Sequence, residues 1–220
     1  MNKIIPALDV SKEDALALIE KLKPVENLLA GYKVGSLLVY AHGINVLKEI
    51  KNKTDVPIIY DGQKLGTDIP DIVRDQVKLL ATADVDQLIV CPMGSGRETL
   101  KVFAETCIIQ KKKIEPICVV KMTHPGADDF LLRRSHVGIF YAAKYFGIRK
   151  FIFPATHPEV FGDIYFDGSE TIMATGFKVQ GGKAELLRKL GVTEFIVGRA
   201  IYQADDPVQA VKDFSKEINR

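Results

Sequence analysis

The chain alternates short apolar segments rich in β-branched residues with longer segments in which apolar residues recur every three or four positions. The first pattern predicts buried strands, and the second predicts amphipathic helices. The expected strands cover residues 3–8, 29–35, 56–60, 86–91, 115–122, 150–154, 170–174 and 194–198. The expected helices cover residues 11–23, 36–51, 70–82, 95–110, 128–146, a short stretch from 158, 183–190 and the stretch from 207 onward.

These strand and helix units follow one another about eight times, with no linker-like or low-complexity stretch between them. The order predicts a single α/β domain over residues 1–220, in which eight parallel strands close into a (β/α)8 TIM barrel. A doubly wound open sheet is the alternative arrangement of the same alternation.

Charge and cysteine content narrow the possible partners and compartment. Thirty basic residues against 28 acidic ones leave a net charge of +2, and the only notable run of one sign is residues 111–113, so we expect no nucleic-acid partner. No apolar run approaches the ~18 residues of a membrane helix, and a strand begins at once, so we expect a cytoplasmic protein with no membrane partner. Cys91, Cys107 and Cys118 lack metal spacing, so we expect reduced, buried thiols.

Polar residues gather where the expected strands end. In a barrel of this kind, the carboxyl ends of the strands carry the chemistry. The residues found there are Asp9, Lys33, Asp61, Lys64, Thr123, Gln180 and Arg199. Any one of them alone would be an ordinary solvated loop residue, but their convergence on one rim predicts a functional site.

The turn after the third expected strand carries two carboxylates and one ammonium group: Asp61, Lys64 and Asp68. Leaving water costs each ion several kcal/mol unless an opposite charge lies beside it, so we expect the three to form one group. Strand residues three apart point to opposite faces, so the backbone must leave the strand to bring them together. We expect Gly62 and Gly66 to supply that conformational freedom.

The loops after the last two expected strands predict a phosphate site. Gly181 and Gly182 precede a helix, where backbone N–H groups approach an anion most readily. Gly198-Arg199 places a guanidinium at the next strand end, where it would hold phosphate oxygens. These two loops are the recurrent phosphate site of the barrel fold, so we expect a substrate that carries a phosphate monoester.

Several motifs, in order along essentially the whole chain, resemble those of the orotidine 5′-phosphate decarboxylase family. They are Tyr32-Lys33-Val34-Gly35, Asp61…Lys64…Asp68-Ile69-Pro70, Met122-Thr123-His124-Pro125-Gly126-Ala127, Ala155-Thr156-His157-Pro158-Glu159, and Gln180-Gly181-Gly182 with Gly198-Arg199. The resemblance implies a homodimeric barrel lyase that decarboxylates orotidine 5′-monophosphate to uridine 5′-monophosphate (UMP), the last step of pyrimidine biosynthesis. It also implies that no metal and no organic cofactor take part.

The resemblance assigns roles to individual residues. Catalysis would fall to an alternating array of Lys33, Asp61, Lys64 and Asp68, in which Lys64 protonates the carbanion at C6 and Asp68 serves the partner subunit's site. The implied substrate-binding residues are Asp9, Lys33, Asp61, Asp68, Ile69, Thr123, Thr175, Gln180, Gly181, Gly198 and Arg199.

The chain departs from the family pattern in the charged turn. Both intervals, from Asp61 to Lys64 and from Lys64 to Asp68, are one residue longer than in the family. The longer turn either keeps the side chains in place or marks a changed site. Ile72 stands where the family usually has a threonine that touches the ribose of the partner's substrate. Thr123 replaces a serine and keeps its hydroxyl, and His157 replaces an arginine.

Two other functions fit parts of the pattern. A Mg²⁺-dependent sugar-phosphate enzyme of the same superfamily, such as a 3-keto-L-gulonate 6-phosphate decarboxylase or a hexulose-6-phosphate synthase, would accommodate the altered spacing and would require metal. A phosphate-ligand-binding protein that had lost the chemistry would keep the barrel, but the presence of all four charged residues argues against it.

Overall fold

The structure, a computed structural model, describes residues 1–124, 126–127, 129–176 and 183–220, apart from the side chains of Gln63, Lys64 and Lys183. Eight parallel strands form one sheet in the order β1-β8-β7-β6-β5-β4-β3-β2. The strands are β1 (Lys3–Pro6), β2 (Tyr32–Gly35), β3 (Ile58–Asp61), β4 (Gln87–Val90), β5 (Glu115–Val119), β6 (Lys150–Pro154), β7 (Thr171–Thr175) and β8 (Val192–Val197).

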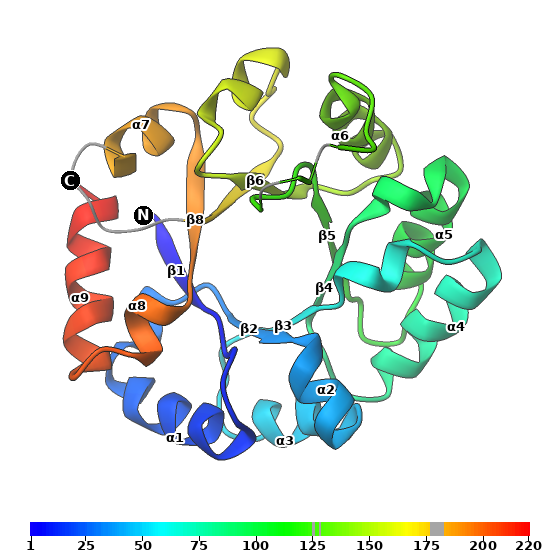
Figure 1. The fold of residues 1–220 in the computed structure, drawn as a ribbon. Coiled ribbons are helices and arrows are strands. Elements are labelled where there is room, and N and C mark those ends of the chain that lie inside the picture. The colour runs from blue at the N-terminus through cyan, green and yellow to red at the C-terminus, as the bar shows by residue number, and fades with distance from the viewer. Residues whose placement is uncertain (125, 128, 177–182) are drawn as a thin grey trace.

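The two ends of this strand order also meet, which closes the sheet into a barrel. Isolated parallel bridges join Ile4 to Leu29 and Ala7 to Lys33. The N–H of Leu8 donates to the carbonyl of Lys33 at 2.8 Å. Figure 1 looks into the ring of strands, with the helices arranged around its outside. The predicted TIM barrel is therefore confirmed, and an open sheet is excluded.

Helices connect the strands, and short 3₁₀ helices (η) occupy several of the remaining connections. They are α1 (Lys12–Leu22), η1 (Lys23–Leu28), α2 (Ser36–His42), α3 (Asn45–Lys51), η2 (Gln63–Gly66), α4 (Pro70–Ala81), η3 (Pro92–Gly94), α5 (Gly96–Ile108), α6 (Ser135–Tyr145), η4 (Pro158–Asp163), α7 (Lys183–Lys189), α8 (Arg199–Tyr202) and α9 (Pro207–Ile218). In the described part of the chain, none of them has the length and apolar character that crossing a bilayer requires.

Two of the predicted helices were wrong in extent. The expected helix over residues 36–51 is two helices, α2 and α3, because Gly43 breaks it at a φ of +73°. The expected helix over 128–146 begins only at Ser135; its expected first residue, Asp128, lies outside the described residues. Phe130 and Leu132 in this segment are 100% and 86% exposed, so neither makes a core contact that would hold it in a helix.

The buried apolar residues form two layers. One lies between the strands and the surrounding helices. The other fills the inside of the barrel and consists of Ile5, Ala7, Ile59, Ile89, Cys91, Ile117, Val119, Ile152, Met173 and Ile196. Cys91, Cys107 and Cys118 are free and buried, as predicted. Because the interior is filled with apolar side chains, polar chemistry is confined to the two ends of the barrel.

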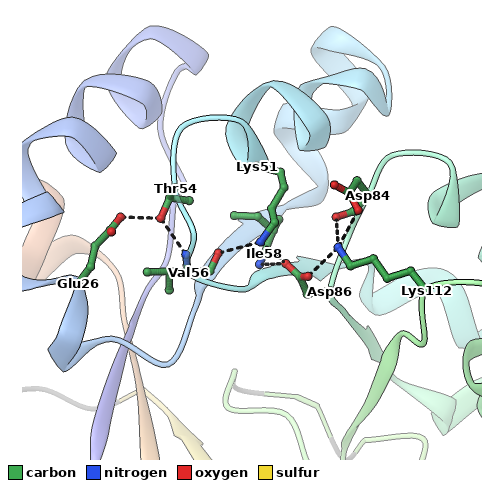
Figure 2. Close-up of polar contacts among 8 residues, drawn as sticks. All are labelled: Glu26, Lys51, Thr54, Val56, Ile58, Asp84, Asp86 and Lys112. Carbon is green, nitrogen blue, oxygen red and sulfur yellow. Dashed lines mark hydrogen bonds and ion pairs between the residues drawn. The ribbon is translucent and has the colours of Figure 1, made fainter.

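A network of ion pairs and hydrogen bonds fastens the amino-terminal ends of β3 and β4 (Figure 2). Asp86 accepts a hydrogen bond from the N–H of Ile58 at 2.8 Å, and its carboxylate lies 3.0 Å from Lys51 and 2.8 Å from Lys112. Lys112 also pairs with Asp84 at 2.7 Å. Lys112, from the basic run 111–113, therefore has a structural role at the end of the barrel opposite the site described next.

Candidate active site

Three charged residues meet at the carboxyl-terminal end of the barrel. Lys33 on β2 pairs in register with Ile59 on β3, so Asp61, two residues further on, lies on the same face of the sheet. The Lys33 ammonium lies 2.8 Å from Asp61 Oδ2 and 3.5 Å from Oδ1 of Asp9, which follows β1. Barrel closure between β1 and β2 is what brings Asp9 to this pair.

The environment keeps Lys33 charged. Burial of this side chain opposes the charge, but the nearby carboxylates of Asp61 and Asp9 outweigh it and hold the pKa of Lys33 above its ordinary value. The side chains of Lys33 and Asp61 are each 11% exposed, whereas that of Asp9 is 48% exposed. Asp61 Oδ1 is buried and accepts no hydrogen bond from any described group. The cluster therefore has a buried carboxylate oxygen that is able to accept a further hydrogen bond.

A cavity of about 640 Å³ opens beside this cluster and collects most of the predicted site residues. Its lining includes Asp9, Lys33, Asp61, Thr123, Thr175, Gly198 and Arg199. Arg199 begins the short helix α8, and Gly198 precedes it as the N-cap residue. The residues predicted for the reactive end and for the phosphate end thus share one cavity.

The lengthened turn after β3 folds as η2, which is closed by a 2.7 Å hydrogen bond from the N–H of Leu65 to the carbonyl of Gly62. The expected role of Gly62 and Gly66 was wrong, because neither residue has a positive φ. They are needed for space: a Cβ on Gly62 would lie 2.5 Å from Leu65 Cδ1, and one on Gly66 would be 3.2 Å from the carbonyl oxygen of Cys91. The Ser95 hydroxyl also donates to the carbonyl of Gly66.

Some predicted site residues are not in the cavity lining of this one chain. Asp68 is exposed, and its Oδ1 accepts a hydrogen bond from the N–H of Ile69 at 2.7 Å. Ile69 is 63% exposed. Gln180, Gly181 and the Lys64 side chain lie outside the described residues.

The cavity also contains residues that sequence reasoning missed, among them Lys121, Gly176, Tyr202 and Gln203. Lys121 precedes Thr123 by two residues, so the alternation of strand side chains was a signal that could have found it. Tyr202 and Gln203 belong to α8 and its end, and that helix is too short to leave a periodic pattern.

A second cavity of about 600 Å³ adjoins the first and shares Asp9, Lys33 and Asp61 with it. From these residues it extends along an apolar wall that includes Leu37 and Tyr40 of α2 and Leu79 of α4. In the described part of the chain, no group of three or more His, Cys, Asp or Glu residues is placed to hold a metal ion.

Comparison with known proteins decides which family this site belongs to. Residues 2–214 match the model of the family described as "Orotidine 5'-phosphate decarboxylase / HUMPS family". The chain belongs to this family. Relatives in it include the orotidine 5′-phosphate decarboxylases of Pyrococcus furiosus, 34% identical over 98% of this chain and 97% of the relative, and of Methanocaldococcus jannaschii, 30% identical over the full length of both. The chain is therefore an enzyme of the carboxy-lyase class.

Solved structures agree with this placement. The orotidine 5′-monophosphate decarboxylase of Methanocaldococcus jannaschii, complexed with the inhibitor BMP, superposes with a TM-score of 0.84 at 28% identity and full coverage of both chains. The Pyrococcus horikoshii enzyme also gives a TM-score of 0.84, at 31% identity and 99% coverage of both chains. The family resemblance inferred from the motifs is confirmed over the whole chain.

Proposed function

We propose that this chain decarboxylates orotidine 5′-monophosphate to UMP in the cytoplasm, in pyrimidine biosynthesis, without a metal or organic cofactor. The observation that carries the proposal is the buried Lys33, held by Asp61 and Asp9 in the lining of a cavity, in a member of the decarboxylase family. A nucleotide bound there would place its reactive ring toward this cluster and its phosphate toward Gly198 and Arg199.

Placed charge is what this reaction requires. Loss of carbon dioxide from C6 leaves an electron pair in an sp² orbital that the ring delocalises poorly, so the barrier must fall through electrostatic stabilisation. In this proposal the Lys64 ammonium lies beside the developing carbanion and then protonates it. Asp61 lies near the substrate carboxylate, where repulsion is relieved as carbon dioxide departs.

Lys33 and Asp68 complete the array around Lys64. Neighbouring carboxylates favour the charged form of an ammonium group, so Asp61 and Asp68 would keep Lys64 protonated until it donates its proton. The unsatisfied Oδ1 of Asp61 is available to accept a hydrogen bond from such a group.

The remaining proposed contacts bind the substrate. Asp9 and Lys33 hold the ribose hydroxyls, Thr123 the pyrimidine edge, and Gln180 with Arg199 the phosphate. Thr175, Gly181 and Gly198 lie along the phosphate end. Binding energy from the distant phosphate would help to assemble the site for the transition state.

We also propose a homodimer in which Asp68 and Ile69 serve the partner's site. The face that carries α2 and α4 exposes five large apolar side chains: Leu37, Tyr40, Ile69, Ile72 and Leu79 are 42% to 79% exposed. Leu37, Tyr40 and Leu79 line the second cavity, which runs into the catalytic cluster. A second protomer on this face would bury apolar surface and close the open side of the site.

Activity is tested first by following loss of the orotate ultraviolet band when purified protein meets orotidine 5′-monophosphate in EDTA. We expect wild-type protein to remove the orotate band rapidly and Lys64→Ala to leave it unchanged. Lys216→Ala, at a lysine exposed on α9, is the control and should remove the band as fast as wild type. Binding without turnover in EDTA, with activity on sugar phosphates restored by Mg²⁺, would instead support the metal-dependent alternative. The orotidine 5′-phosphate decarboxylase names of the relatives disfavour that alternative.

The shared site is tested by mixing two inactive variants, Lys64→Ala and Asp68→Ala. If Asp68 acts across the interface, each mixed dimer has one site with both residues intact, and random exchange should restore about a quarter of wild-type activity. If Asp68 acts within its own chain, no site in the mixture is complete and activity stays absent.

The dimer itself is tested by light scattering with Leu79→Glu, which places a charge on the proposed interface. We expect a monomer from this variant. Leu186→Glu, at a leucine that is 44% exposed on α7, is the matched control and should remain a dimer. A wild-type monomer at micromolar concentration would contradict the proposed assembly.

A further inference from the structure

Lys121, just past the end of β5, lines two cavities at once. One is the active-site cavity. The other, of about 410 Å³, lies beside it, between η4 and the segment that precedes α6. Lys121 has the same strand parity as Ile117 and Val119, which face the barrel interior. Its side chain is therefore part of the wall that the active-site cavity shares with its neighbour.

We propose that Lys121 is a substrate-binding residue that donates a hydrogen bond to a carbonyl oxygen of the pyrimidine. This inference rests on the function proposed above and adds a residue to its binding site. It assigns Lys121 to the base rather than to the phosphate of the nucleotide.

The strand order supports this assignment. The catalytic cluster lies on β2 and β3, and the proposed phosphate residues lie at the ends of β7 and β8. Between these two sides, β5 is separated from β3 by β4 alone and from β7 by β6 alone. In a nucleotide that reaches from the cluster to the phosphate site, the part that lies next to Lys121 would therefore be between the two ends. The phosphate end would lie away from Lys121.

The chemistry of the lining on this side supports a contact to the base. On β5 and β6 and just after β5, the described lining residues are Val119, Lys121, Met122, Thr123 and Ile152. Of these, only Thr123 and Lys121 have polar side chains, and an ammonium group is a donor that accepts no hydrogen bond. Pyrimidine carbonyl oxygens are acceptors, so Lys121 complements them and would reject a base that presents a donor there.

Charge adds to this complementarity. The described lining holds the two carboxylates Asp9 and Asp61 and the three cations Lys33, Lys121 and Arg199. Lys121 is the cation on the side of the cavity on which the base would lie, and a charge-assisted bond there would contribute a factor of about ten or more to binding.

The test compares orotidine 5′-monophosphate with orotidine, which lacks the phosphate. In Lys121→Met and Lys121→Gln, we expect kcat/KM to fall by about tenfold or more for both substrates, and by the same factor. Most of the loss should appear in KM, because the carbonyl is present in both the ground state and the transition state. Arg199→Met should lower kcat/KM for the phosphorylated substrate only, and Arg133→Met, which lines the neighbouring cavity alone, should change neither.

The other outcomes each contradict the inference in a recognisable way. A loss confined to the phosphorylated substrate would place Lys121 at the phosphate, and unchanged kinetics in both variants would remove it from the binding site. A loss that follows a lowered melting temperature and that Lys121→Arg does not reverse would make its role structural. A wild-type protein that fails to consume orotidine 5′-monophosphate would overturn the proposed function itself.

Discussion

Asp61→Asn should destabilise the protein far more than Asp9→Asn, although both carboxylates contact Lys33. Asp61 lies 2.8 Å from the Lys33 ammonium and both side chains are 11% exposed, whereas Asp9 lies at 3.5 Å and is 48% exposed. At an effective dielectric constant of about 20, the gross attraction across 2.8 Å is about 6 kcal/mol, most of which offsets the desolvation of the two ions. Removing one partner of such a buried pair costs about 3–5 kcal/mol.

The asparagine substitution keeps the shape of the side chain and one acceptor, so we take the lower end, about 3 kcal/mol, as the expected loss. For a domain of this size, that corresponds to a fall in Tm of about 6 to 12 °C. Asp9→Asn removes a half-exposed, longer contact, for which about 0–1 kcal/mol is expected. The measurement is urea unfolding at pH 7, with Tm by calorimetry as a second readout.

The stability difference should also depend on pH. Burial opposes the charge of Lys33, but Asp61 and Asp9 outweigh it and raise the pKa of Lys33 in the folded protein. The stability that charged Lys33 contributes is therefore fully present below its unfolded pKa and is lost as pH rises through its folded pKa. In Asp61→Asn, burial opposes the charge of Lys33, and Asp9 is the carboxylate that still favours it. The difference in unfolding free energy between this variant and wild type should therefore narrow above about pH 10. Equal stability of the two variants at pH 7, or a gap independent of pH, would refute the reasoning.

Two further predictions concern residues that support the site. Asp86→Ala removes the hydrogen bond to Ile58 and both lysine contacts, so we expect a loss of about 2 kcal/mol in urea unfolding with kcat unchanged. Burial opposes the charge of Asp86, but its bonds to Lys112, Ile58 and Lys51 lower its pKa. The difference in unfolding free energy between Asp86→Ala and wild type should therefore shrink below about pH 4. A difference that persists at lower pH would contradict this prediction. Gly62→Ala would force a Cβ against Leu65 and Tyr60, so we expect it to lower the free energy of unfolding by about 1–3 kcal/mol and to reduce activity. The control Gly94→Ala, with nothing within 4 Å of the added Cβ, should change neither. Equal effects of the two substitutions would contradict the packing role of Gly62.

The sequence by itself determined the barrel and the rim on which the site lies. Alternating periods of two and near 3.6 report burial within one element, and eight such alternations leave few ways to bury every apolar face. For that reason β6 has its predicted bounds and Asp61 is the last residue of β3, whereas Lys33, expected late in its strand, is the second residue of β2. The motifs around them also identified the family, which the comparison confirmed.

The tertiary structure alone decided which of those residues touch. Lys33 meets Asp9 because β1 and β2 close the barrel, a contact between residues 24 apart that no local pattern encodes. The start of α6 and the existence of α8 were also beyond the sequence. The sequence does not show whether the apolar residues that precede α6 find a core contact, and a single turn of helix such as α8 leaves no period at all.

The glycines of the charged turn show the same division. Their presence predicts a bend after β3, and the bend is there as η2. Whether a glycine is needed for its backbone angles or for the space beside it depends on neighbours such as Leu65, and only the packed structure supplies those neighbours. Local chemistry therefore determined where the chain turns, and the distances between side chains that define a site came from the closure and packing of the whole barrel.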